Sequence, residues 1–416
     1  MDSNQSDRRR FLKQTAALAG VAAGAGLAVR GESAQAQKGE TAEAPHVHRE
    51  PPRRGARYSI DHLTHYTPLQ DYAGIITPAP VHFVQQHSME FPIIDAAEHR
   101  LTIHGMVDRP LSFSMDDLKR LPSVSRIHFV ECHGNSSPAI HGSNDPKMGL
   151  PVQFIHGMAS TSEWTGVPLS VLLNEAGLKR GATWLVSEGA DQGKFSHTLP
   201  MGKALDDVFV AYGQNGEPLR VEQGYPIRLL VPGWEGPFNV KYLRHIKVVD
   251  EPYNTWNESM NHSVSRPDLG GKTRWYHFQW AAKSVITRPS ALMEMRKGYV
   301  NITGLAWSGA GKVAKVEVST DGGRNWREAR LESPVLPKAH TRFNFDWEWN
   351  GQEAVILSRC TDETGDVQPS LAELSGHWGI PLEDWHKPER PRAIHMNAIQ
   401  PWKIARDGSI SDAMFA

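Results

Sequence analysis

The residue with the clearest potential for chemistry is Cys132, within the stretch Arg126–Asn135 (Arg-Ile-His-Phe-Val-Glu-Cys-His-Gly-Asn). An apolar run of β-forming residues precedes it, and a segment rich in turn formers follows it to about Pro151. The thiol is therefore expected where a buried strand opens onto a loop. A thiolate in that position is a suitable ligand for a soft metal ion. The alternative is structural, because a free cysteine is usually buried and packs as a small apolar side chain.

The composition is that of a soluble globular protein with two folded domains plus extensions: 416 residues, 39% hydrophobic and 22% charged. The net charge of −1 gives no electrostatic reason to expect binding to nucleic acid or to an anionic membrane. Two cysteines exclude a disulfide framework and a cysteine-rich zinc site. A bridge between Cys132 and Cys360 would link the two domains and is not expected.

The first 36 residues have the pattern of an export signal. Arg8 and Arg9 form a twin-arginine pair, a weakly apolar Ala/Gly run covers Thr15–Val29, and Ala34–Ala36 is a candidate cleavage site. The run is too short and too glycine-rich to span a bilayer, so no membrane anchor is expected. Twin-arginine export carries folded proteins, which predicts a periplasmic protein that receives a cofactor before export. The alternative is a basic N-terminus that arose by chance.

Residues 37–75 are polar and rich in Pro, His and Arg, and we expect a linker or extended arm there. His46 and His48 lie within it without further metal ligands nearby in the sequence. Residues 76–285 are predicted to form an α+β domain, because short strands alternate with few helices and without a βαβ pattern. Its expected elements are a strand at Leu101–Gly105, a helix capped by Ser114, a helix at Val167–Gly177, and strands at Thr183–Ser187, Val208–Tyr212 and Ile227–Val231.

Residues 286–390 have a different sequence pattern, in which apolar residues alternate with period two between turn signals such as Asp321–Gly323. Such spacing, without a helix, predicts an immunoglobulin-like β-sandwich. Cys360 shares a strand face with Ile356 and is expected in its core. The predicted strands are Val300–Trp307, Lys312–Ser319, Phe343–Trp347 and Ala354–Cys360. Residues 391–416 are expected to pack as a C-terminal arm.

Several motifs occur in order around Cys132. They are Trp164–Leu169, Glu188–Asp191, Gln223–Arg228 leading into Leu229–Gly236, Asn239–Leu243 and, in the tail, Asn397–Trp402. Together with Cys132 they resemble the sulfite oxidase family of molybdopterin enzymes, and within it the catalytic subunits of bacterial sulfane (sulfite) dehydrogenases. The resemblance runs from about residue 80 to the tail.

The resemblance implies a mixed α/β molybdopterin-binding domain followed by an immunoglobulin-like dimerisation domain, with Mo-molybdopterin as cofactor. Cys132 would be the metal ligand, and Asn261 and His262 lie near the position of the family's catalytic tyrosine. The implied cofactor contacts are His87, Gln86, Asp191, Gln223, Arg228, Asn239 and Lys241. Arg228 offers a rigid fork and Lys241 a compact charge to a pterin phosphate. The structural alternatives are an ion pair for Arg228 and a turn cap for Asp191.

The departures from the family pattern bear on the substrate. Gln85, Ser137 and Trp378 are expected where sulfite oxidases carry pocket arginines, Phe154 replaces a tryptophan, and Gln223 replaces a histidine. Each missing charge-assisted hydrogen bond is worth about 1.5–3 kcal/mol to a bound dianion. Tight binding of free sulfite is therefore disfavoured, and a sulfur substrate presented on another protein is compatible with the pattern.

The expected activity is oxidation of sulfite or carrier-bound sulfane sulfur in the periplasm, with oxygen taken from water. The sequence contains no Cys-x-x-Cys-His haem motif, so electrons are expected to pass to a separate c-type cytochrome. A sulfur-carrier protein and a second copy of the chain are the other expected partners. Two alternatives stand: a sulfoxide-type molybdopterin reductase or an oxidase of another substrate, and a cofactor-binding but catalytically impaired assembly or docking subunit. The altered pocket favours the impaired subunit, whereas Cys132, Arg228 and Lys241 oppose it.

Overall fold

The computed structural model describes residues 64–88, 90–137, 150–265, 270, 274–385 and 395–414. The predicted signal peptide, most of the predicted linker, and His46 and His48 lie outside the described residues. No helix in the described part of the chain is long and apolar enough to cross a membrane.

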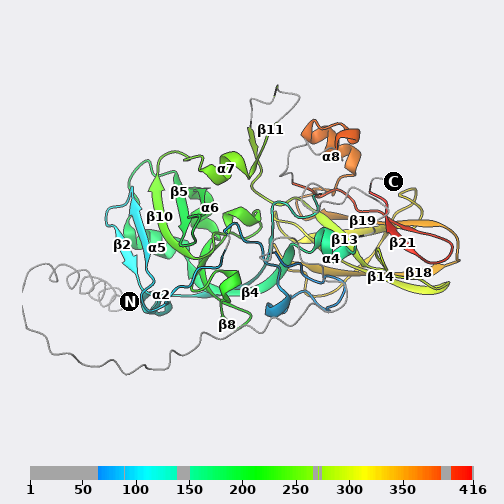
Figure 1. The fold of residues 1–416 in the computed structure, drawn as a ribbon, viewed down its shortest axis with the longest axis horizontal. Coiled ribbons are helices and arrows are strands. Elements are labelled where there is room, and N and C mark those ends of the chain that lie inside the picture. The colour runs from blue at the N-terminus through cyan, green and yellow to red at the C-terminus, as the bar shows by residue number, and fades with distance from the viewer. Residues whose placement is uncertain are drawn as a thin grey trace, which may run out of the picture. The chain divides into compact units, whose positions relative to one another are not determined.

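Two five-stranded β-sheets and short helices make up the first domain (Figure 1). One sheet has the order β2-β1-β10-β5-β6, in which β1 and β10 are parallel and the other pairs antiparallel. Its strands are β1 (Leu101–Gly105), β2 (Leu111–Phe113), β5 (Trp184–Gly189), β6 (Ser196–Pro200) and β10 (Leu243–Val249). The other sheet has the order β3-β4-β7-β8, with β9 also paired to β7. Its strands are β3 (Val124–Glu131), β4 (Ala159–Pro168), β7 (Phe209–Gln214), β8 (Glu217–Pro218) and β9 (Arg228–Leu230).

Helix α5 (Leu169–Ala176) contacts both sheets through β1, β4 and β7 and shares one buried cluster with them. Helix α2 (Met115–Arg120) begins with a capping box between Ser114 and Asp117, as a serine before an acidic third position predicts. The remaining helical elements of the domain are α4 (Val152–His156), α6 (Met201–Asp206), α7 (Trp256–Met260), η1 (Ala79–Val81), η3 (Val221–Gln223) and η4 (Gly236–Phe238). A hairpin of β11 (Ser263–Ser265) and β12 (Arg274–Tyr276) follows α7.

The second domain is a β-sandwich, which confirms the predicted fold class. One sheet has the order β13-β14-β18-β17 and the other β16-β15-β19-β20-β21. The strands of the first are β13 (Lys283–Arg288), β14 (Gly298–Trp307), β17 (Arg330–Leu331) and β18 (Thr341–Trp349). The strands of the second are β15 (Val313–Ser319), β16 (Arg327–Glu328), β19 (Ala354–Asp362), β20 (Trp402–Ile404) and β21 (Ile410–Asp412). Cys360 and Ile356 are fully buried in the core between these sheets, as predicted, and both cysteines of the chain are free.

Three local expectations differ from the structure. The helix predicted from Val167 begins at Leu169, because Val167 and Pro168 still pair with β7 and a residue before proline favours an extended backbone. The predicted sandwich had no helix, but α8 (Leu371–Trp378) follows β19 with a Ser370–Glu373 capping box, and η6 (Leu382–Asp384) comes after it. The tail adds β20 and β21 to a sandwich sheet, where Trp402 is fully buried.

A buried ion pair joins the two domains beside the predicted metal ligand. Lys283 Nζ, on β13, lies 2.6 Å from Glu131 Oε1, and Trp307 Nε1, on β14, donates to Glu131 Oε2 at 2.6 Å. Asn135 Nδ2 donates to Glu131 Oε1 at 2.9 Å. The sandwich therefore holds the residue that immediately precedes Cys132.

Candidate cofactor site

A pocket opens at the end of β3, and it brings together residues that are far apart in the sequence. Nine of the ten residues predicted for the site line it. They are Gln86, His87, Cys132, Asp191, Gln223, Arg228, Asn239, Lys241 and His262. The tenth, Asn261, is exposed at the end of α7 and does not line the pocket.

The position of Cys132 is fixed by backbone contacts on both sides. Its N–H donates to the carbonyl of Met158 at 2.9 Å, and its carbonyl accepts from Asn135 N–H at 2.9 Å. Gly236 lies against it, because a Cβ added there would be 2.7 Å from the Glu131 carbonyl oxygen and 3.0 Å from Cys132 Cα. Burial, together with the Glu131 and Glu235 carboxylates, raises the pKa of the Cys132 thiol to about 11. The sulfur thus keeps its proton at neutral pH unless a bound cation stabilises the thiolate.

Two basic side chains, the buried Arg228 and the half-buried Lys241, line the pocket without a carboxylate partner among the described residues. Arg228 donates through Nη1 to the Gln223 carbonyl at 3.2 Å and through Nη2 to the Asn239 carbonyl at 3.1 Å, while its buried Nε has no hydrogen-bond partner. Lys241 Nζ donates to the carbonyls of Gln85 and Glu222, both at 3.0 Å. Burial lowers the pKa of Arg228 to about 10 and that of Lys241 to about 7. An anion in the pocket would relieve the desolvation of both groups.

A close approach between two loops sets the position of Lys241. Gly224 has φ of 104°, and a Cβ there would lie 3.0 Å from Lys241 Cβ. A larger residue would therefore be strained and would displace the lysine. The ion-pair alternative for Arg228 is not seen in the described part of the chain, where its guanidinium bonds to carbonyls and lies 5.0 Å from the centre of the Trp164 ring.

Asp191 and two imidazoles also line the pocket. The Asp191 carboxylate accepts hydrogen bonds from Ser88 Oγ at 2.5 Å and from the Phe195 N–H at 3.0 Å. It therefore also caps its turn, which is the structural alternative given for this residue. His87 stacks on Phe195 at 4.9 Å and meets His262 edge-on at 5.6 Å. Burial, and after it Lys241, lowers the pKa of His87 to about 4, so this imidazole is neutral.

The residues predicted to replace family arginines are not all at the pocket. Gln85 lines it. Ser137 is buried beside the Cys132 turn, Trp378 lies in a separate cluster with Trp385, and Phe154 packs on Tyr66 at 4.9 Å. Ser137, Trp378 and Phe154 do not line the pocket, so these positions do not determine its charge.

Several lining residues were not singled out from the sequence, among them Glu222 and Tyr242. Tyr242 has φ of 55° and lies directly after Lys241, where its hydroxyl donates to the Val221 carbonyl at 2.8 Å. Glu222 and Tyr242 adjoin the motif residues Gln223 and Lys241, and this adjacency was the sequence signal that could have predicted them. Glu235, which precedes the lining residue Gly236, was not predicted either, although it lies within the motif Leu229–Gly236.

The donor set fits Mo-molybdopterin. Cys132 offers the soft ligand, and the free Arg228 Nε with Lys241 offers charge to a phosphate. Gln86, His87, Gln223 and Asn239 supply polar groups around them. These residues would hold the cofactor, with the metal at Cys132 and the pterin along the Arg228–Lys241 side.

Comparisons with known proteins agree with this geometry. Residues 88–257 match the oxidoreductase molybdopterin binding domain, and residues 276–389 match the Mo-co oxidoreductase dimerisation domain. The chain is 31% identical over 336 residues to sulfite oxidase of Gallus gallus, covering 75% of this chain and 72% of that protein. It is 30% identical to the NADH nitrate reductase of Ulva prolifera (72% of this chain, 38% of that protein) and to mitochondrial sulfite oxidase of Rattus norvegicus (75% and 61%). The chain thus spans less than two thirds of the length of the last two relatives.

A solved structure gives a match over nearly the whole chain. The crystal structure of the sulfane dehydrogenase SoxCD from Paracoccus pantotrophus superimposes with a TM-score of 0.79 at 37% identity, covering 91% of this chain and 96% of that chain. Sequence, fold and the donor set around Cys132 therefore lead to one conclusion: the chain belongs to the sulfite oxidase family of molybdopterin oxidoreductases and uses Mo-molybdopterin as its cofactor.

Proposed function

We propose that the chain is the molybdenum-bearing part of a periplasmic dehydrogenase that oxidises sulfite or carrier-bound sulfane sulfur. The observation that carries the proposal is Cys132 opening into a pocket whose basic side chains, Arg228 and Lys241, have no carboxylate partner among the described residues. The bound cofactor supplies two-electron redox chemistry and oxygen-atom transfer, with the oxygen derived from water and two protons released. The solved relative is named a sulfane dehydrogenase and other relatives are named sulfite oxidases, which supports a sulfur substrate.

The chain's own residues have defined parts in this proposal. Cys132 holds the metal, Arg228 and Lys241 hold the anionic end of the cofactor, and Gly224 and Gly236 keep those side chains in place. The imidazoles of His87 and His262 form a neutral wall, because burial lowers the pKa of both. A wall of that kind offers hydrogen bonds to a substrate without the charge that would capture a free dianion from solution.

Electron transfer and export complete the proposal. A c-type cytochrome is the proposed acceptor, since the sequence has no haem-attachment motif of its own. The twin-arginine pattern at Arg8 and Arg9 supports export to the periplasm with the cofactor already inserted.

A charge added at Gln85 tests the substrate. Gln85 lines the pocket, its side-chain oxygen accepts from Thr64 at 3.0 Å, and its carbonyl accepts from Lys241. In steady-state kinetics at low salt, Gln85→Arg is expected to lower the KM for free sulfite by about tenfold or more, because one charge-assisted hydrogen bond is worth about 1.5–3 kcal/mol. The KM for a carrier-bound persulfide should change less.

The matched control is Gln352→Arg, which adds the same charge at an exposed turn of the sandwich. It should leave both KM values unchanged at two ionic strengths. A wild-type protein that already binds free sulfite tightly, with steep salt dependence, would contradict the proposal for a carrier-bound substrate. A molybdenum-loaded protein with no dye-linked oxidation of either substrate would contradict the proposed function itself.

The sandwich supports a homodimer, because residues 276–389 match a dimerisation domain. Sedimentation velocity is expected to give a species of twice the mass of one chain at micromolar concentration. A monomer that persists at every concentration tested would count against the dimer.

A further inference from the structure

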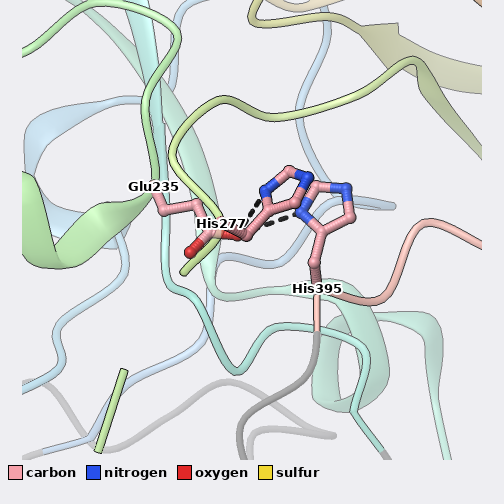
Figure 2. A group of neighbouring side chains, drawn as sticks. All are labelled: Glu235, His277 and His395. Atoms are coloured by element: carbon pink, nitrogen blue, oxygen red, sulfur yellow. Dashed lines mark hydrogen bonds and ion pairs between the residues drawn. The ribbon is translucent and has the colours of Figure 1, made fainter. Parts of the chain in front are cut away.

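A buried carboxylate next to the cofactor pocket is surrounded by imidazoles. Glu235 is 1% exposed, and its Oε1 lies 3.1 Å from His277 Nδ1 and 3.0 Å from His395 Nδ1. Its other oxygen pairs with His133 Nδ1. Figure 2 shows the rings of His277 and His395 one over the other, each directing a nitrogen to the carboxylate of Glu235. No described lysine or arginine pairs with this carboxylate, and its ring partners in the described part of the chain are the three imidazoles.

The spacing of these atoms suits a small cation. One carboxylate oxygen and one nitrogen from each of His277 and His395 all lie within 4.8 Å of one another. Zinc binds such ligands at about 2.0–2.2 Å in a tetrahedron, whose corners are then roughly 3.3–3.6 Å apart. The observed separations of 3.0 and 3.1 Å from the carboxylate oxygen to the two nitrogens are only a few tenths of an ångström shorter. His277 is the half-buried member, so its side leaves access for a water as fourth ligand.

The backbone places these ligands independently of any ion. Glu235 N–H donates to the Phe278 carbonyl at 2.8 Å, and Trp280 N–H donates to the Gly233 carbonyl at 3.0 Å, so the segment around His277 runs beside that of Glu235. The tail is attached to the same region by Asn397 Nδ2, which donates to the Ala282 carbonyl at 3.1 Å. His133, on the second carboxylate oxygen, fixes the rotation of the Glu235 side chain, as an outer partner does in metal sites.

We propose that Glu235, His277 and His395 bind one divalent cation of the zinc class, separate from the molybdenum held at Cys132. The donor set of two imidazoles and one carboxylate, without a thiolate, favours zinc over the oxygen-binding cations magnesium and calcium. Such an ion would join three segments: the β9–η4 connection of the first domain, the chain leading into β13, and the C-terminal tail. Its role is structural and does not depend on the substrate.

Calorimetric titration of zinc into the tag-free, chelator-treated full chain, with elemental analysis of zinc and molybdenum, tests the proposal. The wild type is expected to bind one zinc per chain, with nitrogen and oxygen but no sulfur in the zinc K-edge spectrum. His277→Ala is expected to weaken zinc binding by about 100-fold or more, since losing even an outer partner costs about 10–100-fold. Because His277 is half-buried, the fold should tolerate this change, and Glu235→Gln provides a second variant with the same expected loss.

Two controls separate this site from others. His245→Ala removes a half-exposed histidine that lies 3.5 Å from Glu188. Among the described residues no second imidazole pairs with that carboxylate, so zinc affinity should not change. Cys132→Ser should also keep its zinc, whatever happens to its molybdenum. The proposal is overturned if the wild type takes up no stoichiometric zinc, if His277→Ala binds zinc as the wild type does, or if Cys132→Ser loses it.

Discussion

Cys132→Ser is expected to lower turnover to the level of protein that lacks molybdenum, while the pterin stays bound. Serine is a hard oxygen donor, so the metal would lose the soft ligand that we propose Cys132 supplies, and its redox properties would change. The groups expected to hold the pterin phosphate, Arg228 and Lys241, are untouched by the substitution. Molybdenum X-ray absorption should show one Mo–S contact fewer, and fluorescence of the released, oxidised pterin should match that of the wild type.

The control is Cys360→Ser in the sandwich core, which removes the only other thiol of the chain. Its Mo–S count should equal that of the wild type even if its stability falls. An unchanged sulfur count in Cys132→Ser would remove this residue from the metal's coordination.

Lys283→Met is expected to destabilise the folded protein by about 3–5 kcal/mol, the usual cost of leaving one charge of a buried pair without its partner. Both side chains of the pair are at most 1% exposed, and Glu131 would keep only the hydrogen bonds from Asn135 and Trp307. Burial alone raises the pKa of the Glu131 carboxyl, and Lys283 opposes that rise. Urea denaturation followed by tryptophan fluorescence measures the loss.

The same substitution at an exposed pair is the matched control. Lys315 lies 3.2 Å from Glu317 with 42% of its side chain exposed, and Lys315→Met should cost less than about 1 kcal/mol. Adding Glu131→Gln to Lys283→Met should recover part of the lost stability, because it removes the uncompensated charge. Equal effects at Lys283 and Lys315 would mean that the buried pair contributes no more than a surface one.

Much of the fold follows from local patterns in the sequence. The sandwich strands were predictable because one face of each is buried, as in β15, where Val313, Val316 and Val318 point to the core. The tail strands were not, because β20 and β21 have three residues each and lie close to a proline- and arginine-rich segment. The start of α5 was misplaced by two residues because the apolar spacing continues through Val167, whereas pairing with β7 decides its conformation.

The cofactor pocket was predictable where a motif lies on one short segment, as Asn239 and Lys241 do. The cluster of imidazoles around Glu235, next to the pocket, was not predictable. Glu235 and His395 are 160 residues apart, and no local pattern connects them. Of the three positions expected to replace family arginines, only Gln85 lines the pocket. Ser137 and Trp378 are buried elsewhere in the fold, and no local pattern in the sequence predicts those positions.

The C-terminal tail also has a consequence for truncation. His395 reaches Glu235, Asn397 reaches Ala282, and Gln400 Oε1 lies 3.2 Å from His156 Nε2, so the tail contacts three segments that are far from it in the sequence. A chain cut before His395 would lose all three contacts at once, although every strand of the first domain would still be present. A short deletion in the tail is therefore expected to disturb a region more than 100 residues away in the sequence.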